Sequence, residues 1–410
     1  MNILITNIWL QNLGGTEVFV RDLAKALFDD GHHIEVYSPR TGMLANEIRS
    51  FGIHVTDNIQ MLKTVPDIIH AHHFLPCMEV MNVFRKCPVV YFVHDYSFNG
   101  DIPPVSERIT KYVAVDALCL EKLFQYEIPR EKTEVLHNWV DISRFRHRDI
   151  FKNKPERALV FSNYAKPDNH YRIISSTCRD FGIDIDGIGM GFGNSIADPE
   201  RILPHYDIIF AKGKSAMEAM ASGAAVIVCD FRGLGGMVTS SNFEYFRKYN
   251  FGMKTMNKII EPRTLLAELN NYDPLDCKAV TERIRREASF DLYIKQIEIL
   301  YDELINKFTL NSASIDYSIE QAIFSTFDLS QKASKVHSDH LEHRIREMGL
   351  SLQDLNQKIN GLEIEKRELL QGINARKREN QQLTEELNRY REMQVDLNKK
   401  RKSFWRKLFL

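Results

Sequence analysis

The part of this 410-residue sequence that best fits a chemical role is a strand–turn–helix signal in its second half. The apolar run Ile208-Ile-Phe210 precedes Gly213-Lys214-Ser215, and apolar residues then recur at helical spacing over about 215–222. Backbone N–H groups at the start of a helix lack partners within it, and together with the helix dipole they attract anions. The pattern therefore predicts a phosphate site. Glu218 falls in the expected first turn of the helix, where an acidic side chain also interacts favourably with the helix dipole.

A second group of candidates lies in the first half, where two apolar runs lead into His70, His72 and His73 and into His94-Asp95. Histidine can bind a metal or exchange protons near neutral pH. No Asp-x-Asp pair or compact His and Cys set completes a metal site, so we expect no metal. His94 ends an expected inner strand. It is either a hydrogen-bond partner of a substrate hydroxyl or a satisfied core histidine.

The elements that must position these residues follow from alternating apolar runs. Continuous short runs predict strands, and runs with apolar residues three and four apart predict helices. Apolar strands separated by helices indicate parallel sheets covered on both faces. Two such doubly wound sets place a ligand cleft between them, at the carboxyl ends of the strands. We expect strands over 2–8, 34–37, 68–71, 89–93, 112–115, 134–136, 158–161, 183–188, 206–210 and 225–229, and closing helices over 279–288 and 292–307.

Charges are distributed unevenly, although the formal net charge is only −1. Residues 1–330 contain 36 basic and 43 acidic side chains, whereas the last twelve residues contain six basic and no acidic ones. The near-neutral total argues against nucleic acid as a partner. The six cysteines form no Cys-x-x-Cys pair, which is typical of reduced core thiols. No apolar run approaches the roughly 20 residues that span a bilayer, so any membrane contact is expected at the surface.

Beyond about residue 338 the pattern changes to a seven-residue period. Apolar residues occupy thirteen of the seventeen a and d positions from Leu341 to Leu397, with Lys366 and Asn380 at a positions. This pattern predicts a coiled coil, with a parallel homodimer favoured and a homotrimer as the alternative. A long single helix folded back on the body is the other interpretation.

The segment 399–410 combines basic and aromatic residues. On a helix the aromatic and leucine side chains fall on one side and the bases on the other, as in an interfacial anchor. We expect this tip to bind an anionic membrane surface, with partner binding and a solvated tail as alternatives. The residues expected to contact the membrane are Lys399, Lys400, Arg401, Lys402, Phe404, Trp405, Arg406, Lys407, Leu408 and Phe409.

Residues 206–230 resemble the donor-binding segment of GT-B glycosyltransferases, in particular the retaining family-4 type. Three other stretches fit in the same order, so that the resemblance covers about residues 1–307. They are Gly14-Gly15-Thr16-Glu17 with its following helix, the runs 67–72 and 89–95, and Val135-Leu-His-Asn-Trp-Val-Asp-Ile-Ser-Arg-Phe145, which is similar to the family's Asn-Gly-Val-Asp-x-x-x-Phe run. The resemblance implies an acceptor-side domain followed by a nucleotide-sugar domain, and it implies no bound metal or other cofactor.

The resemblance also implies roles for single residues. Glu218 would hold the ribose hydroxyls of the donor, and His94 and Lys166 would be catalytic. Lys166 would neutralise the leaving diphosphate, with a solvated surface lysine as the alternative. The expected donor-binding residues are Gly14, Gly15, Asn163, Gly213, Lys214, Ser215 and Glu218.

Two positions depart from the family. Phe210 stands where the family has a further Glu, eight residues before Glu218, that contacts the donor sugar. Asn163 stands where an Arg is expected, and Lys212 and Lys214 could compensate for it. Phe210 cannot accept a hydrogen bond. We therefore expect that sugar recognition is rearranged or that activity has been lost.

The expected fold is α/β, with two Rossmann-like doubly wound parallel-sheet domains (GT-B) followed by a long α-helical coiled coil. The expected function is retaining transfer of a hexose from a nucleotide-sugar to a lipid-linked cell-surface glycan, by a cytoplasmic protein on the inner face of the membrane. The alternatives are an inactive GT-B scaffold that organises polysaccharide assembly and, less favoured, a GT-B epimerase. The expected segments are an acceptor-side domain (1–148), a donor domain (149–288), a closing helix (289–308), a linker (309–338), the coiled coil (339–398) and the tip (399–410).

Overall fold

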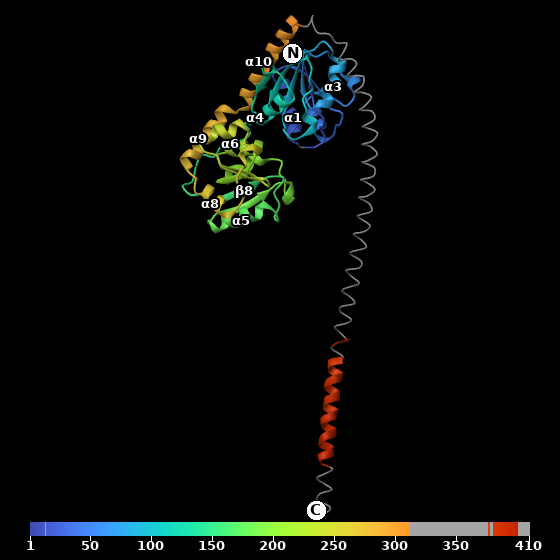
Figure 1. Cartoon of the computed structure of the whole chain (residues 1–410), viewed down its shortest axis with the longest axis vertical. Helices are drawn as coiled ribbons and strands as arrows, with labels where there is room; N and C mark the ends of the chain where they lie inside the picture. The colour runs from blue at the N-terminus through green and yellow to red at the C-terminus, as the bar shows by residue number, and fades with distance from the viewer. Residues whose placement is uncertain (13, 312–375, 378–379, 401–410) are drawn as a thin grey trace, which may run out of the picture. The chain divides into compact units, whose positions relative to one another are not determined.

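The structure is a computed structural model, and it describes residues 1–12, 14–311, 376–377 and 380–400. The chain divides into one compact unit over Met1–Phe324 and another over Ser325–Leu410. The first unit contains two α/β domains, each built on its own sheet (Figure 1).

The first domain is a seven-stranded sheet in the order β3-β2-β1-β4-β5-β6-β7, with every neighbouring pair parallel. All five residues of the interior strand β5 are buried, as expected where helices cover both faces. The strands are β1 (Asn2–Thr6), β2 (His33–Tyr37), β3 (His54–Thr56), β4 (Ile68–His72), β5 (Val89–Val93), β6 (Ile109–Ala114) and β7 (Thr133–Val135). The helices are α1 (Gly15–Asp29), α2 (Met43–Ser50), α3 (Phe74–Val83) and α4 (Ala117–Gln125).

The second domain is a five-stranded sheet in the order β12-β11-β10-β8-β9. Its edge strand β12 is antiparallel to β11, which differs from the all-parallel expectation. Only two residues connect these strands, and so short a connection joins only antiparallel neighbours. The strands are β8 (Arg157–Phe161), β9 (Asp184–Ile188), β10 (Ile208–Ala211), β11 (Ala225–Asp230) and β12 (Gly233–Met237). The helices are α5 (His170–Asp180), α6 (Gly213–Ala221), α7 (Phe243–Lys248), α8 (Pro262–Leu269) and α9 (Pro274–Glu287).

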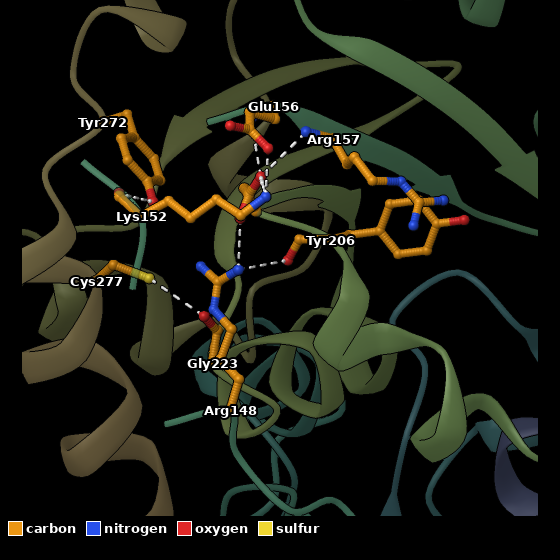
Figure 2. A network of polar contacts seen from close by, with 9 residues as sticks. Arg148, Lys152, Glu156, Arg157, Tyr206, Gly223, Tyr272 and Cys277 are labelled. Carbon is orange, nitrogen blue, oxygen red and sulfur yellow. Dashed lines mark hydrogen bonds and ion pairs between the residues drawn. The ribbon is translucent and has the colours of Figure 1, made fainter. Parts of the chain in front are cut away.

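The segment between β7 and β8 is fixed to the second domain by one buried carboxylate. Asp207 accepts hydrogen bonds from Arg148 Nη1 at 2.6 Å and from the backbone N–H groups of Glu156 and Arg157 at 2.8 and 3.0 Å. Burial opposes the ionisation of Asp207, but these donors outweigh it and lower its pKa. Figure 2 shows the labelled side chains that surround this contact, with Arg148 pointing toward Tyr206.

The chain crosses back to the first domain beside its first crossing. The backbone N–H of Val140 donates to the Ala288 carbonyl at 2.8 Å, and the N–H of Phe290 donates to the Val140 carbonyl at 3.0 Å. The helix α10 (Phe290–Asn311) then packs along the first domain (Figure 1). Its buried residues join the core of that domain, and they are Tyr293, Ile294, Ile297, Leu300, Tyr301 and Leu304.

The described part of the second unit is a helix over 380–400, preceded by helical residues 376–377. Most of the heptad series, the start of the predicted coiled coil at 339 and the tip residues 401–410 lie outside the described residues. Within the parts of the chain that the structure describes, no helix is both long and apolar enough to cross a membrane.

Candidate active site

A cleft of about 510 Å³ lies between the two domains, and residues of both line it. In the first domain these residues follow β1, β5 and β6, and in the second they follow β8, β10 and β11, so the cleft lies at the carboxyl ends of parallel strands. This is where open α/β sheets bind ligands, and it agrees with the cleft that the sequence predicts.

The start of α6 forms one wall of the cleft. The helix begins at Gly213, two residues earlier than expected, and Gly213 has a φ of +58° that favours glycine. Its N–H donates to the Phe251 carbonyl at 2.9 Å, whereas the N–H groups of Lys214 and Ser215 have no partner among the described residues. Two free N–H groups therefore remain at the positive helix end, as the predicted phosphate site requires.

Two lysines stand beside this helix start and line the cleft. The ammonium of Lys212 pairs with the carboxylate of Asp230, a side chain that is fully buried. The Nζ atom of Lys214 lies 3.4 Å from Asp22 Oδ2 on α1 and 4.1 Å from the centre of the Trp139 ring. Both positive charges are thus close enough to meet an anion bound at the N-terminus of α6.

His94 lies opposite, at the end of β5, and lines the cleft. Its Nε2 is 2.8 Å from His72 Nδ1, and Phe19 packs edge-on at 4.7 Å between ring centres. Burial lowers the pKa of His94 to about 3, with a smaller contribution from His73, so the ring is neutral.

The surroundings of the two rings assign the tautomer of His94. His72 is buried, and its Nε2 has no partner among the described residues. An unpaired buried N–H costs more than an unpaired lone pair, so His72 keeps its proton on Nδ1 and donates it to His94 Nε2. His94 then carries its own proton on Nδ1, which no described residue accepts. If His94 contacts a substrate, it therefore does so as a neutral ring that donates a hydrogen bond from Nδ1.

Glu218 faces a second, smaller pocket of about 250 Å³ beside the cleft. Because α6 begins at Gly213, Glu218 lies in its second turn and not in the first, so the dipole argument for it was wrong. Burial raises the pKa of Glu218 to about 7, while the nearby Lys214 and Arg144 act in the opposite direction. No described side chain donates to its carboxylate, which leaves it open to a ligand.

Trp139 and Lys214 line both pockets and stand between them. The Trp139 ring is 3% exposed, stacks on Phe290 at 3.9 Å, and its Nε1 has no partner among the described residues. A ligand that reaches both His94 and Glu218 must pass this pair.

The structure brings only some of the predicted site residues together. Gly15, His94, Gly213 and Lys214 line the cleft, and Glu218 lines the adjoining pocket. The residues that line neither pocket are Gly14, Asn163, Lys166 and Ser215.

Two of these outlying residues have structural contacts. Asn163 Oδ1 accepts from the backbone N–H of Met190 at 3.2 Å. The Gly14 carbonyl accepts the N–H of Val18 at 3.0 Å at the start of α1, and a Cβ atom on Gly14 would meet only the movable end of the Glu17 side chain, so the fold does not require glycine there. The Lys166 side chain is exposed, which fits the alternative of a solvated lysine.

The interpretation of Phe210 needs correction. Phe210 lies inside β10, is 0% exposed, and packs in the core formed with Val160, Ile174 and Leu265. Only Lys212 separates β10 from α6, so this chain has no room for a loop at that point. Phe210 is therefore a core residue. The expectation that sugar recognition is rearranged or that activity has been lost, which rests on the missing Glu, stays a prediction.

Several cleft residues carry no sequence signal that would have singled them out. Asn250 is 4% exposed, donates through Nδ2 to the Val115 carbonyl, and accepts from the N–H of Asn138 at 3.2 Å, so it joins the two domains at the cleft. Tyr164 and Arg232 add aromatic and positive groups to the second-domain wall. Among the described residues, no three His, Cys, Asp or Glu side chains are grouped as a metal site would need.

Comparison with solved structures defines the class of fold. A glycosyltransferase from Rickettsia africae ESF-5 matches with a TM-score of 0.56 at 15% identity, over 74% of this chain and 98% of its own. Anabaena Alr3699/HepE in complex with UDP and glucose matches with a TM-score of 0.54 at 16% identity, over 74% and 100%. Sucrose-phosphate synthase from Thermosynechococcus elongatus gives 0.52 at 12% identity, over 75% and 99%. The two-domain body has the GT-B fold.

The family comparison agrees with the fold. Residues 13–144 match the family model of Glycosyltransferase Family 4. Comparison with curated protein sequences gives no match. The resemblance to GT-B glycosyltransferases is therefore confirmed: the body shares their fold, and residues 13–144 match the Family 4 model.

Proposed function

We propose that the protein transfers a hexose from a nucleotide-sugar to a glycan acceptor. The observation that carries this proposal is the start of α6, which has two free N–H groups, together with Lys212 and Lys214, which line the same cleft as the neutral His94. The N-terminus of α6 would hold the diphosphate, and Glu218 would bind the ribose hydroxyls. The UDP and glucose found in the complex of Anabaena Alr3699/HepE support the choice of a nucleotide-sugar donor.

In this proposal the protein binds the donor and neutralises the charge of its diphosphate, and the donor supplies the leaving group. The bond between the anomeric carbon and the phosphate oxygen breaks as charge develops on the diphosphate, and the acceptor hydroxyl oxygen forms the new bond to that carbon on the same face. Lys212, Lys214 and the helix N–H groups stabilise that charge where it forms. His94 donates its Nδ1 proton in a hydrogen bond to a sugar hydroxyl, and the leaving diphosphate takes the proton of the acceptor hydroxyl. The configuration is retained.

Thermal unfolding of the whole chain with UDP, ADP and GDP tests the donor. The matching nucleotide should raise Tm, since a ligand that binds only the folded state stabilises it. Lys214→Met should weaken its binding about tenfold or more, as expected for a lost charge-assisted contact to phosphate. The matched control Lys278→Met removes an exposed α9 lysine far from the cleft. If no nucleotide raises Tm, the enzyme proposal fails and the scaffold alternative takes its place.

A second measurement tests the reaction itself. NMR spectroscopy of the product formed from the identified nucleotide-sugar reports its anomeric configuration. Retention supports the proposal, and inversion contradicts it.

We further propose that the chain self-associates through residues 339–398. The described end of this segment has an apolar series at three- and four-residue spacing, Leu383, Leu387 and Tyr390, with exposed fractions of 55%, 55% and 73%. A second copy would cover this series by heptad packing, as a parallel dimer or a trimer. Sedimentation of the whole chain measures the state. Leu383→Asp with Leu387→Asp should give monomers, and an unchanged mass would overturn this proposal.

We also propose that the protein is cytoplasmic and that residues 399–410 bind the inner face of the membrane, where a lipid-linked acceptor would be met. The basic and aromatic composition of these residues supports this proposal. Deletion of 399–410 should release the protein from anionic phospholipid vesicles, with neutral vesicles as the control. Unchanged co-sedimentation would contradict it.

A further inference from the structure

The charged side chains of the cleft are separated by domain. Among the described residues that line it, the first domain supplies the carboxyl groups of Glu17, Asp95, Asp101 and Asp116 but no lysine or arginine. The second domain supplies Lys212, Lys214, Arg232 and Lys254 but no aspartate or glutamate. One wall is therefore acidic and the facing wall is basic.

The positive charges of the basic wall attract the phosphates of the donor, and the negative charges of the acidic wall repel them. A phosphate placed near the first domain would meet Asp95, whose pKa is lowered because hydrogen bonds from Ser97 and Phe98 outweigh the effect of burial. Asp95 is thus a carboxylate at neutral pH, and its repulsion of an anion acts over several ångströms in this partly enclosed space.

The acidic wall also carries an aromatic surface. Trp9 and Phe98 lie with ring centres 5.6 Å apart and planes tilted by 45°, and both rings are partly exposed in the cleft. Tyr96 adds a third ring that is 37% exposed. Aromatic faces of this kind pack against the C–H face of a sugar ring and leave its hydroxyl groups free at the edge.

The same wall carries the carboxyl groups of Asp95 and Asp101, which can form hydrogen bonds with sugar hydroxyls. Asp101 is 1% exposed, and its Oδ2 accepts the N–H groups of His94 and Asp95 at 2.6 and 2.7 Å. Its Oδ1 is buried and has no partner among the described residues, and burial raises the pKa of Asp101 to about 7, so near neutral pH this carboxyl group can either donate or accept a hydrogen bond. Asp95 Oδ1 accepts from Ser97 and Phe98, whereas no described residue donates to its Oδ2. A sugar hydroxyl can donate to Asp95 Oδ2 and can pair with Asp101 in either protonation state, whereas an anionic group cannot donate to Asp95.

We infer that the first-domain wall, formed by Trp9, Phe98, Asp95 and Asp101, is the subsite for an uncharged sugar ring of the acceptor and rejects rings that carry phosphate or carboxylate. This inference rests on the proposed function and names the chemical class of its acceptor. A longer glycan can carry charges elsewhere, provided that the ring in the cleft has none.

Binding measurements test this selectivity without requiring transfer. The whole chain is saturated with the nucleotide that raises its Tm and then titrated by calorimetry with the p-nitrophenyl glycosides of glucose, galactose and mannose. Each sugar is compared with its own 6-phosphate. We expect at least one neutral glycoside to bind about tenfold more tightly than its 6-phosphate at low salt, and this ratio should shrink as salt screens the charges.

Two variants locate the effect in the acidic wall. Asp95→Asn keeps the Oδ1 that accepts from Ser97 and Phe98, so the local turn is preserved while the charge is removed. It should reduce the preference for the neutral glycoside about threefold or more, whereas the exposed control Asp184→Asn should not. Trp9→Ala should weaken the neutral glycoside, and Trp9→Phe should restore most of the binding.

Three results would overturn the inference. They are equal or tighter binding of the 6-phosphates, an unchanged preference in Asp95→Asn, and failure of every neutral glycoside while the nucleotide still binds. Failure of the nucleotides themselves is a different outcome, because it removes the proposed function.

Discussion

The contact between Lys214 and Asp22 leads to a prediction that runs against the usual effect of removing an ion pair. In the proposed function Lys214 contacts the donor phosphates, whereas in this structure its Nζ lies 3.4 Å from Asp22 Oδ2 and above the Trp139 ring. Asp22 lies on α1 of the first domain and Lys214 on α6 of the second, and both line the small pocket that Glu218 also lines. A bound donor must take Lys214 away from Asp22. Asp22→Asn should therefore tighten donor binding.

The size of the gain follows from how exposed the pair is. The side chains of Lys214 and Asp22 are 31% and 22% exposed, so water screens their attraction, and pairs of this kind contribute about 0.2–1 kcal/mol. Relief of this competition corresponds to a Kd that is lower by a factor of about 1.4 to 5. A second effect has the same sign, because the charge of Asp22 helps to raise the pKa of Glu218, and its loss leaves more of Glu218 ionised at neutral pH.

Calorimetric titration of the whole chain with the matching nucleotide measures this gain. Asp29→Asn is the matched control, since Asp29 lies on the same helix and lines the same small pocket but pairs with Lys25. Lys214→Met must weaken binding in the same assay. If Asp22→Asn leaves Kd unchanged or raises it while Lys214→Met weakens binding, Asp22 does not compete for Lys214 and the reasoning is refuted.

Three further predictions follow from single side chains. Because burial places the folded-state pKa of Glu218 at about 7, above the unfolded value of 4.5, this group should lower Tm as pH rises from about 4.5 to 7 and change it little above that, whereas nucleotide affinity should rise as pH passes through about 7. Glu218→Gln should flatten both profiles in pH-dependent melting and titration, and unchanged profiles would exclude Glu218. Phe210→Glu should lower the free energy of unfolding, measured by urea denaturation, by about 3 kcal/mol or more, because it buries a charge. It should gain no sugar binding, and a stable, more active variant would contradict the role of Phe210 as a core residue. His72→Phe should lower kcat about tenfold with little change in the donor KM, since it removes the partner that orients His94. His72→Gln should keep part of the rate, and equal rates in both variants would show that His72 only fills space.

The elements of the fold could be predicted because their signals are local. Apolar runs such as 89–93 become buried strands of the expected length. The helix over 215–222 was placed two residues late, since small residues such as Gly213 and Ser215 carry little periodicity. The antiparallel β12 was not expected, since its glycine-rich sequence, Gly-Leu-Gly-Gly-Met, lacks the signature of a strand.

The site was harder to predict because its contacts join distant parts of the sequence. Phe210 was compared with a family position by spacing alone, and spacing does not show that its side chain packs in the core. Residues 22, 139 and 214 meet only in the folded chain, and so do Asn138 and Asn250. One local signal for this region did exist: Trp139 stands where the similar family run has glycine. The separation of acidic and basic side chains between the two walls of the cleft could not be predicted from the sequence, because it depends on which side chains line the same cavity in the folded chain.

The two crossings between the domains, bonded to each other at Val140 and Ser289, determine how the cleft can change its width. Two neighbouring chain segments resist twisting more than a single segment does, so the domains are best able to rotate about one line through that contact. The chain leaves the body through α10, whose buried face belongs to the core of the first domain. Any rotation at the two crossings therefore moves the second domain relative to α10 and the first domain together, and the aromatic and acidic wall keeps its position relative to α10.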